Sequence, residues 1–411
     1  MKPTVVYWNN IPSPYVVERF NAVSQRGNLD FEAWFIERRE PDRSWDVCEA
    51  DWRFRARYLA ARSVAGRRLS LPLAELRAVR PELVVSAYAP ASFAFGHLAV
   101  RASGARAAFR SLPTFDAWVR RSKPKEFAKH FLFHSVDGAK VPGPDGGRMA
   151  QRYGLPADRI FPVTQSVDIE HYGHAVEMAP SVRELRRSEL GLRGCVFLYV
   201  GRLWSGKGLD FLLDAYAAVH DQYPDTSLLL VGDGVDEEHY RAAAGELSDV
   251  AFGGFVQPRE LPDWYALADA FVFPTLGDPH GLVVEEAMAA GLPVICTEAA
   301  GDIRRRLPDG EAGYVVPPAD SATLADRMSR LASDPDRRRS FAAEARRLVV
   351  SRNHEHYAID FETFVERVLA LPPRRTPASY VARAAGMCLM ALPTTRMVAP
   401  LVSSAYTADE P

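Results

Sequence analysis

Short apolar segments alternate with amphipathic segments along most of the chain. Between the apolar segments, Leu209, Leu212 and Val219 follow the spacing of a helix with one buried face. Runs of three to six apolar residues between Gly, Pro or Asp are typical of buried strands in a parallel sheet. Such runs occupy residues 4–8, 31–36, 83–86, 107–109, 196–200, 228–231, 271–273 and 294–296. This alternation predicts βαβ units and an α/β fold with doubly wound sheets.

The length of the chain predicts more than one such sheet, because 411 residues exceed what one doubly wound domain usually needs. We expect a first domain over residues 1–168, a linker over 169–190 and a second domain over 191–350. Residues 351–372 are expected to form a helix that returns to the first domain. Residues 373–411 are expected to be an irregular tail.

Composition and charge exclude several classes of protein. The net charge is −2, which gives no general basic field for nucleic acid. The four cysteines have no metal-ligand spacing, and Asp334-Pro335-Asp336, followed by three arginines, is interpreted as a helix cap. No secretion signal or membrane-spanning run is evident, so a cytoplasmic location is expected. The apolar stretch 380–392 either lies on the inner membrane surface or packs on the first domain.

The first segment with candidate chemistry follows the strand predicted at 196–200. It places Gly201, Arg202, Lys207 and Gly208 between that strand and a helix. Ligands of open α/β sheets bind at the carboxyl ends of strands, where helix N-termini present free N–H groups. Two fixed cations in such a turn favour an oxygen-rich polyphosphate over an ordinary solvated loop.

The second segment follows the strand predicted at 271–273. Asp278 precedes a helix, Gly281 permits close approach of the backbone, and Glu286 lies about one turn inside the helix. The amides of Leu282 and Val283 are candidates for binding a phosphate. The two carboxylates suit sugar and ribose hydroxyls. In the alternative interpretation, Asp278 caps a turn and Glu286 is solvated, as its neighbour Glu285 is expected to be.

Together the two segments resemble the retaining glycosyltransferases of family 4, which have the GT-B architecture. The resemblance extends from Tyr199 to about Leu331. Its ordered motifs are Gly201-Arg202 with Lys207-Gly208, Val231-Gly232-Asp233-Gly234, Phe252 to Val256, Tyr265 to Asp269, and Asp278 to Glu286. It implies two doubly wound Rossmann-like domains that face a central cleft.

The resemblance also implies roles for individual residues. Arg202 and Lys207 would hold the diphosphate of a nucleotide-sugar donor and stabilise it as leaving group, with no metal and no cofactor. Glu286 would bind the ribose, and Asp278 with the 281–283 backbone would meet the sugar and phosphate. Gly201, Phe255 and Val256 would complete the donor site. The family has glutamate where this chain has Asp278, which leaves the donor's identity open, with a UDP-sugar as one candidate.

The acceptor side carries weaker signals. Lys123 and Lys125 belong to a basic run that suits an anionic acceptor or a solvated helix face, and Asp116 stands where the family has a catalytic-loop histidine. The resemblance implies transfer of a sugar to a hydroxyl of a polysaccharide, a lipid-linked glycan or a natural product. A nucleotide-sugar epimerase and a non-catalytic nucleotide-sugar-binding partner of a transferase are the alternatives.

Overall fold

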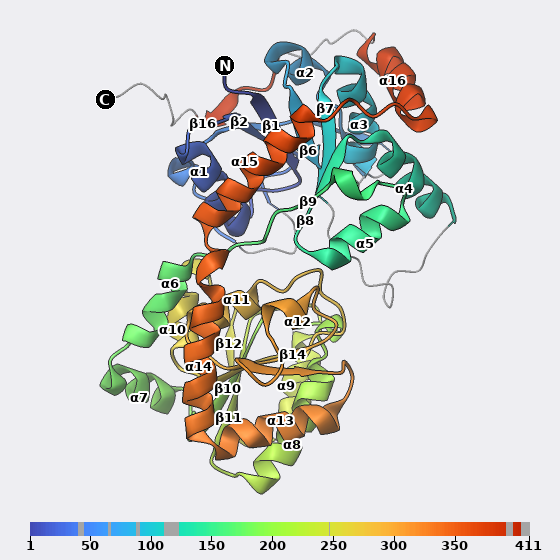
Figure 1. Ribbon diagram of the computed structural model, residues 1–411. Helices are drawn as coiled ribbons and strands as arrows, with labels where there is room; N and C mark the ends of the chain where they lie inside the picture. The colour runs from blue at the N-terminus through green and yellow to red at the C-terminus, as the bar shows by residue number, and fades with distance from the viewer. Residues whose placement is uncertain are drawn as a thin grey trace. The chain divides into compact units, whose positions relative to one another are not determined.

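The computed structural model describes residues 1–39, 45–64, 67–87, 91–110, 123–245, 247–391 and 398–403. Their contacts divide into two units (Figure 1). The first unit contains the described residues up to Gln165 together with those from His354 onward, and the second contains Ser166–Asn353. The helix expected to return to the first domain is α15 (His354–Ala370), which belongs to the first unit. Residues 169–190, expected as a linker, form helices of the second unit.

A mostly parallel sheet lies at the centre of the first unit. Its strand order is β16-β3-β2-β1-β6-β7-β8-β9, with β16 antiparallel to β3. The strands, with the separate β4–β5 hairpin, are β1 (Thr4–Asn9), β2 (Asp30–Phe35), β3 (Arg55–Tyr58), β4 (Ala61–Val64), β5 (Arg67–Ser70), β6 (Leu83–Ser86), β7 (Arg106–Arg110), β8 (Gly138–Val141), β9 (Ile160–Pro162) and β16 (Leu401–Ser403).

Helices cover both faces of this sheet (Figure 1). Besides α15, the helices of the unit are α1 (Pro14–Gln25), α2 (Leu73–Val79), α3 (Ala91–Ser103), α4 (Lys123–Ser135), α5 (Pro144–Arg152) and α16 (Pro377–Met390). Alternate residues of β1 point to opposite faces, as the period of a strand requires. Val5 and Tyr7 pack with α1 and α15, and Val6 and Trp8 pack with α2, α3 and α4.

The tail contains a helix where irregular structure was expected. Thr376 caps the start of α16, since its hydroxyl accepts a hydrogen bond from the backbone N–H of Ser379. It packs against α3 and α4, and a Cβ at Gly386 would lie 1.8 Å from the carbonyl oxygen of Leu98. The glycine therefore lets the two backbones touch, and the apolar stretch packs on the first unit.

The second unit contains a parallel sheet with the order β12-β11-β10-β13-β14-β15. The chain moves outward from β10 to β12 on one side and then continues from β13 to β15 on the other, so the order reverses beside β10. Ligand sites of open α/β sheets form at such reversals. The strands are β10 (Cys195–Val200), β11 (Thr226–Val231), β12 (Val250–Gly254), β13 (Ala270–Phe273), β14 (Val294–Thr297) and β15 (Gly313–Val316).

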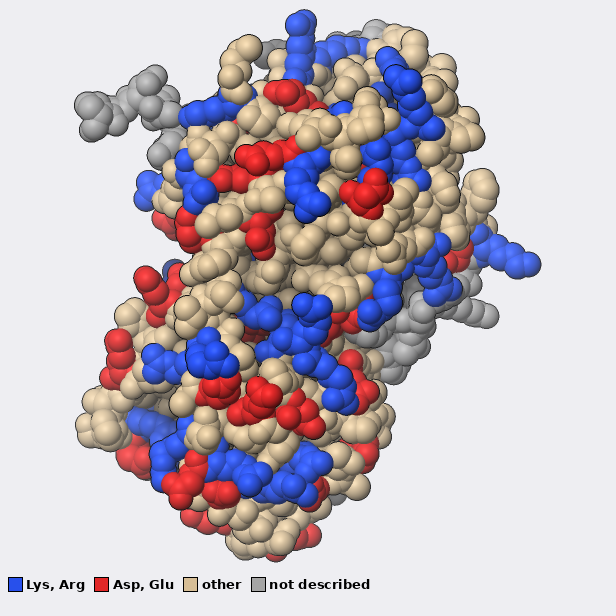
Figure 2. Space-filling model, viewed as in Figure 1, with Lys and Arg blue, Asp and Glu red and all other residues tan. Residues whose placement is uncertain are grey.

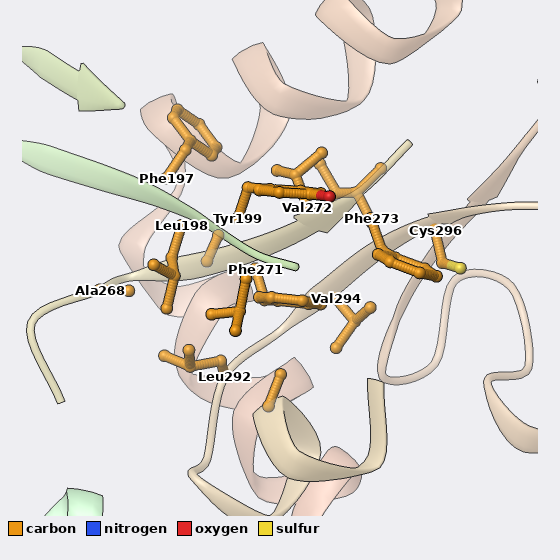
Figure 3. Packing of buried hydrophobic residues seen from close by; sticks show 14 of the residues in the cluster. Phe197, Leu198, Tyr199, Ala268, Phe271, Val272, Phe273, Leu292, Val294 and Cys296 are labelled. Carbon is orange, nitrogen blue, oxygen red and sulfur yellow. The ribbon is translucent and has the colours of Figure 1, made fainter. Parts of the chain in front are cut away.

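The central strands of this sheet are buried on both faces. Figure 3 shows side chains of β10 and β13, among them Phe197, Tyr199, Phe271 and Phe273, packed within one apolar cluster. This burial confirms the strand type predicted from the continuous apolar runs. The helices are α6 (Ile169–Gly173), α7 (Pro180–Glu189), α8 (Leu209–Gln222), α9 (Glu237–Ala244), α10 (Leu261–Tyr265), α11 (Val283–Ala289), α12 (Ile303–Arg306), α13 (Ser321–Ser333) and α14 (Pro335–Val349).

Two further features bear on the sequence predictions. Asp334 caps α14, since its Oδ1 accepts a hydrogen bond from the backbone N–H of Arg337 at 2.9 Å, which confirms the interpretation of Asp334-Pro335-Asp336. Figure 2 shows Lys and Arg lying among Asp and Glu on the visible face of the second unit. None of the helices in the described part of the chain is both long and apolar enough to span a bilayer.

Candidate functional site

The two loops singled out by sequence meet at the carboxyl ends of neighbouring strands. β10 pairs with β13 in parallel, so the loop after Val200 and the loop after Phe273 leave the same edge of the sheet. The backbone N–H of Leu276 donates to the carbonyl of Gly206 at 3.1 Å. The two loops are therefore joined through their backbones.

Gly208 permits this close approach of the two loops. Its φ is +70°, in the left-handed region, and a Cβ there would lie 2.2 Å from the carbonyl oxygen of Pro274. Only glycine fits both the conformation and the space. Helix α8 begins at the next residue, so the same glycine also fixes where the helix starts.

Lys207 and Asp278 form an ion pair across the two loops. The distance from Nζ to Oδ2 is 2.6 Å, and the side chains are only 15% and 18% exposed. Burial alone would raise the pKa of Asp278, but the Lys207 ammonium and the backbone N–H of His280 outweigh burial and hold that pKa below its ordinary value. Asp278 therefore stays ionised, and the ligand-free loops hold one cation and one carboxylate side by side.

Arg202 and Gly201 lie at the start of the first loop. The carbonyl of Arg202 accepts a hydrogen bond from the Tyr199 hydroxyl at 2.8 Å, which fixes the backbone where the strand ends. The Arg202 side chain is half-buried. Gly201 lies against Gly232, where a Cβ would be 1.9 Å from the Gly201 carbonyl oxygen. The loops after β10 and β11 thus touch as well.

Phe255 and Val256 follow β12, at the same edge of the sheet. Both are half-buried, and the carbonyl of Gly254 accepts a hydrogen bond from the N–H of Gly232 at 2.7 Å. The structure therefore places these residues two strands away from the Arg202 loop. Their role in the donor site, where they would contact the nucleotide base, stays a prediction.

Glu286 is a buried carboxylate of α11. It has no exposed surface, and its Oε2 accepts a hydrogen bond from the Tyr265 hydroxyl at 2.9 Å. The alternative of a solvated Glu286 is therefore wrong. Sequence analysis named the Tyr265 motif but not this contact, which holds Glu286 in place. Gly281, Leu282 and Val283 lead into the helix, as predicted, and phosphate binding by their amides stays a prediction.

Glu285 corrects the sequence analysis. It was expected to be solvated, but it is completely buried, because Arg306 of α12 and Arg352, which follows α14, cover it. Both carboxylate oxygens lie 2.7 Å from Nη1 of Arg306, and Arg352 and His280 lie at 3.7 and 3.4 Å. Burial would raise the pKa of Glu285, but Arg306 first, and then His280 and Arg352, hold that pKa below its usual range.

The buried cluster around Glu285 and Arg306 also holds the backbone of the Asp278 loop in place. Arg306 also donates to the carbonyl of Gly301 at 3.2 Å and to the carbonyl of His280. The N–H of Gly301 in turn donates to the carbonyl of Asp278 at 3.0 Å. Sequence reasoning missed these residues, because their side chains come from segments far apart in the chain.

The candidate acceptor residues belong to the first unit. Lys123 and Lys125 are exposed in the first turn of α4, and Asp116 lies outside the described residues. The acceptor role of all three stays a prediction.

Comparison with known proteins identifies the part of the chain that carries these loops. Residues 194–334 match the family described as "Glycosyl transferases group 1". This part of the chain is similar to group 1 glycosyltransferase domains. The match confirms the resemblance to family 4 glycosyltransferases inferred from the motifs of the second unit.

Several curated relatives are glycosyltransferases by name. A phosphatidyl-myo-inositol mannosyltransferase of Mycobacterium leprae is 40% identical over 156 residues, which cover 37% of this chain and 41% of that protein. A D-inositol 3-phosphate glycosyltransferase of Corynebacterium urealyticum is 32% identical over 234 residues, 54% of each chain. The chain thus spans about half the length of the curated relatives it matches.

Solved structures share the fold over most of the chain. Anabaena HepE in complex with UDP has a TM-score of 0.71 at 19% identity, covering 90% of this chain and 100% of that one. Sucrose-phosphate synthase from Thermosynechococcus elongatus has a TM-score of 0.71 at 20% identity, covering 90% and 99%. The fold is GT-B, with two doubly wound α/β units, as predicted.

Proposed function

We propose that the chain is a retaining glycosyltransferase that moves a sugar from a nucleotide-diphosphate sugar to an acceptor hydroxyl without a metal ion. The observation that carries the proposal is the joining of the Lys207 and Asp278 loops at the strand-order reversal beside β10. HepE, which shares the fold, is described in complex with UDP and with UDP-glucose. A UDP-sugar is therefore the first donor to test.

The chemistry follows from the charges on the two loops. Negative charge develops on the diphosphate as the bond from its oxygen to the sugar breaks. Arg202 and the Lys207 ammonium supply fixed positive charge there, which stabilises the leaving group. When Lys207 turns to the diphosphate, Asp278 becomes available to accept a hydrogen bond from a sugar hydroxyl. Glu286, held by Tyr265, would do the same for the ribose. Retention at the anomeric carbon rests on the family resemblance.

Thermal unfolding with UDP-, GDP-, ADP- and dTDP-sugars tests the donor site, with nucleotide release measured in parallel. A donor present at a hundred times its dissociation constant stabilises the folded state by about 2.7 kcal/mol. Arg202→Ala and Glu286→Ala should abolish that shift. Arg339→Ala, at an exposed position of the same unit, is the control and should keep it.

The same assay separates the alternatives. A transferase releases nucleotide in proportion to the sugar transferred to an acceptor. An epimerase converts the sugar without any acceptor and without net release of nucleotide, and a non-catalytic partner binds the donor and converts nothing. Absence of binding by every donor, from protein that is folded, would contradict the proposal.

We propose in addition that the enzyme works in the cytoplasm and touches the inner membrane surface through α16. Tyr380, Val381 and Met387 are exposed on this helix, together with Arg383. An apolar face next to basic residues favours an anionic bilayer surface. Val381→Asp should reduce co-sedimentation with vesicles that contain phosphatidylglycerol, whereas Val350→Asp, at an exposed valine of the second unit, should not. Equal loss in both variants would contradict this contact.

A further inference from the structure

A cluster of buried cations lies in the first unit, near the carboxyl ends of β7 and β8. Lys140 of β8 is 4% exposed, and Arg19 of α1 is 7% exposed. Arg110, the last residue of β7, is half-buried and gives the cluster its more open side. Tyr7 of β1 and Tyr357 of α15 are buried between these cations. The roles proposed above use none of these five residues.

Aromatic rings and hydroxyls surround the cations. The Lys140 ammonium donates to the Tyr357 hydroxyl at 2.8 Å and lies 4.6 Å from the centre of that ring. It lies 5.5 Å from the Tyr7 ring, and the Arg19 guanidinium lies 5.5 Å from the Tyr357 ring. Arg110 hydrogen-bonds to the Tyr7 hydroxyl. Ring faces attract cations, but they do not cancel the charge.

The carboxylates that face this cluster also have other partners. Asp360 faces Lys140 and accepts a hydrogen bond from the backbone N–H of Thr164 at 3.3 Å. Glu18 faces Arg19, and its Oε2 lies 3.1 Å from Nε2 of His354. Lys140 itself forms no ion pair with either carboxylate in the described part of the chain, and its hydrogen bond goes to a neutral hydroxyl.

The charge state of Lys140 reflects these surroundings. Burial, and then the nearby Arg19 and Arg110, hold the pKa of Lys140 well below its ordinary value, against the opposing effect of Asp360. Burial also raises the pKa of Tyr7 and of Tyr357, so both hydroxyls stay neutral near pH 7. An anion placed among these groups would raise the pKa of Lys140 again, because an opposite charge favours the charged form.

We propose that Arg110, Lys140 and Arg19 bind a tetrahedral dianion, the phosphate group of the acceptor, near the carboxyl ends of β7 and β8. The inference deepens the proposed function, on which it rests, by giving the acceptor a chemical class. Arginine forks match phosphate oxygens, and the edge formed by carboxyl ends of parallel strands is where α/β units bind ligands. Binding of the dianion also favours the charged form of Lys140.

Calorimetric titration of the full chain with sulfate tests the site, because sulfate is a dianion that does not titrate near neutral pH. The titration uses the Arg202→Ala background, so that the donor loops contribute little. Arg110→Met and Lys140→Met should each weaken sulfate binding about tenfold or more. Arg148→Met, whose side chain is exposed on α5 of the same unit, should leave it unchanged.

The pH dependence separates this site from a general effect of positive charge. Sulfate affinity should fall as the pH rises through the pKa of Lys140, and Lys140→Met should remove that trend. His354 contacts Glu18, which faces Arg19, so His354→Gln is included as a control and should leave the Lys140 trend in place. A pH trend unchanged in Lys140→Met would overturn the proposal.

A hexose 6-phosphate, the unphosphorylated hexose and inorganic phosphate identify the source of the anion. Tighter binding of the hexose phosphate than of inorganic phosphate, with no binding of the hexose, supports an acceptor phosphate. Equal binding of the two phosphates overturns the acceptor assignment, and binding of neither overturns the site. Donor binding is read separately through Arg202→Ala, so failure of the anion site and failure of the transferase proposal give different results.

Discussion

Two clusters of buried cations, one in each unit, differ in their partners. In the second unit Lys207 meets Asp278 at 2.6 Å, and Arg306 meets Glu285 at 2.7 Å. In the first unit Lys140 meets a hydroxyl and aromatic ring faces instead. The paired groups of the second unit stay ionised after burial, whereas burial lowers the pKa of Lys140.

This difference in pairing indicates a structural role for the ion pairs of the second unit and a binding role for the Lys140 cluster. A buried ion pair fixes the segments that carry it, because removing one partner leaves the other charge uncompensated. A buried cation without such a pair gains its stabilisation from a ligand. The protein is therefore expected to lose stability when a charge of the Glu285–Arg306 pair is removed, and to lose binding when Lys140 is replaced.

Glu285→Gln tests the paired side and has the largest expected effect. The substitution leaves Arg306 buried without its carboxylate, so the free energy of unfolding should fall by about 3–5 kcal/mol. Urea unfolding measures it, with Glu298→Gln, at an exposed ion pair, as the control. Because the folded pKa of Glu285 is lowered, its stabilisation is present above the unfolded pKa and is lost as pH falls through the folded pKa. An equal acid sensitivity of the variant would argue against the pair.

Gly208→Ala tests whether the two loops of the second unit must touch. It adds both left-handed strain and a contact with the Pro274 carbonyl, whereas Gly310→Ala, at φ +81°, adds the strain alone, because no atom lies within 4 Å of its Cβ. Gly208→Ala should therefore cost about 1–3 kcal/mol more in thermal unfolding. It should also weaken UDP binding. Equal costs at both positions would show that the contact between the loops is not needed.

Asp278→Asn tests how the Asp278 carboxylate affects binding of a diphosphate by Lys207. Without the carboxylate, the ammonium no longer has to leave an ion pair to meet a diphosphate. Affinity for UDP should rise, by up to about tenfold or 1.4 kcal/mol, while sugar transfer falls. Calorimetry gives the affinity, and Asp263→Asn, at an exposed position, is the control. A fall in UDP affinity would mean that Asp278 positions Lys207 for the diphosphate.

Lys140→Met has the smallest expected effect on stability. Replacing an unpaired buried amine by an apolar side chain of similar size should change the free energy of unfolding by less than about 1 kcal/mol, or increase it. The cost of the buried charge is present below the folded pKa, and it is relieved as pH rises toward the unfolded value of about 10.4. Wild-type stability should rise in that window, and the variant should lose the rise. A loss as large as that of Glu285→Gln would remove the contrast between the units.

Local pattern was sufficient for the eight strands predicted from apolar runs and for the meeting of the loops after β10 and β13. The apolar runs at 196–200 and 271–273 became β10 and β13, because a run buried on both faces has few alternatives. Glycines and charged residues next to those runs then identified the loops that contain Lys207 and Asp278. The tail was misjudged, because Gly386 reads as a helix breaker until α3 is present to pack against it.

By itself, therefore, the sequence determined the α/β class and the glycines and charges of the loops after β10 and β13, since these depend on residues within a few positions of one another. Only the tertiary structure decided which charges are paired. The sequence around Glu285 predicted a solvated side chain. Arg306 and Arg352, which lie 21 and 67 positions further along the chain, cover it instead. Sequence analysis did not single out Lys140, yet residues of α1, β1, β7 and α15 surround it. Electrostatic partners are set by distance in space, which no local periodicity encodes.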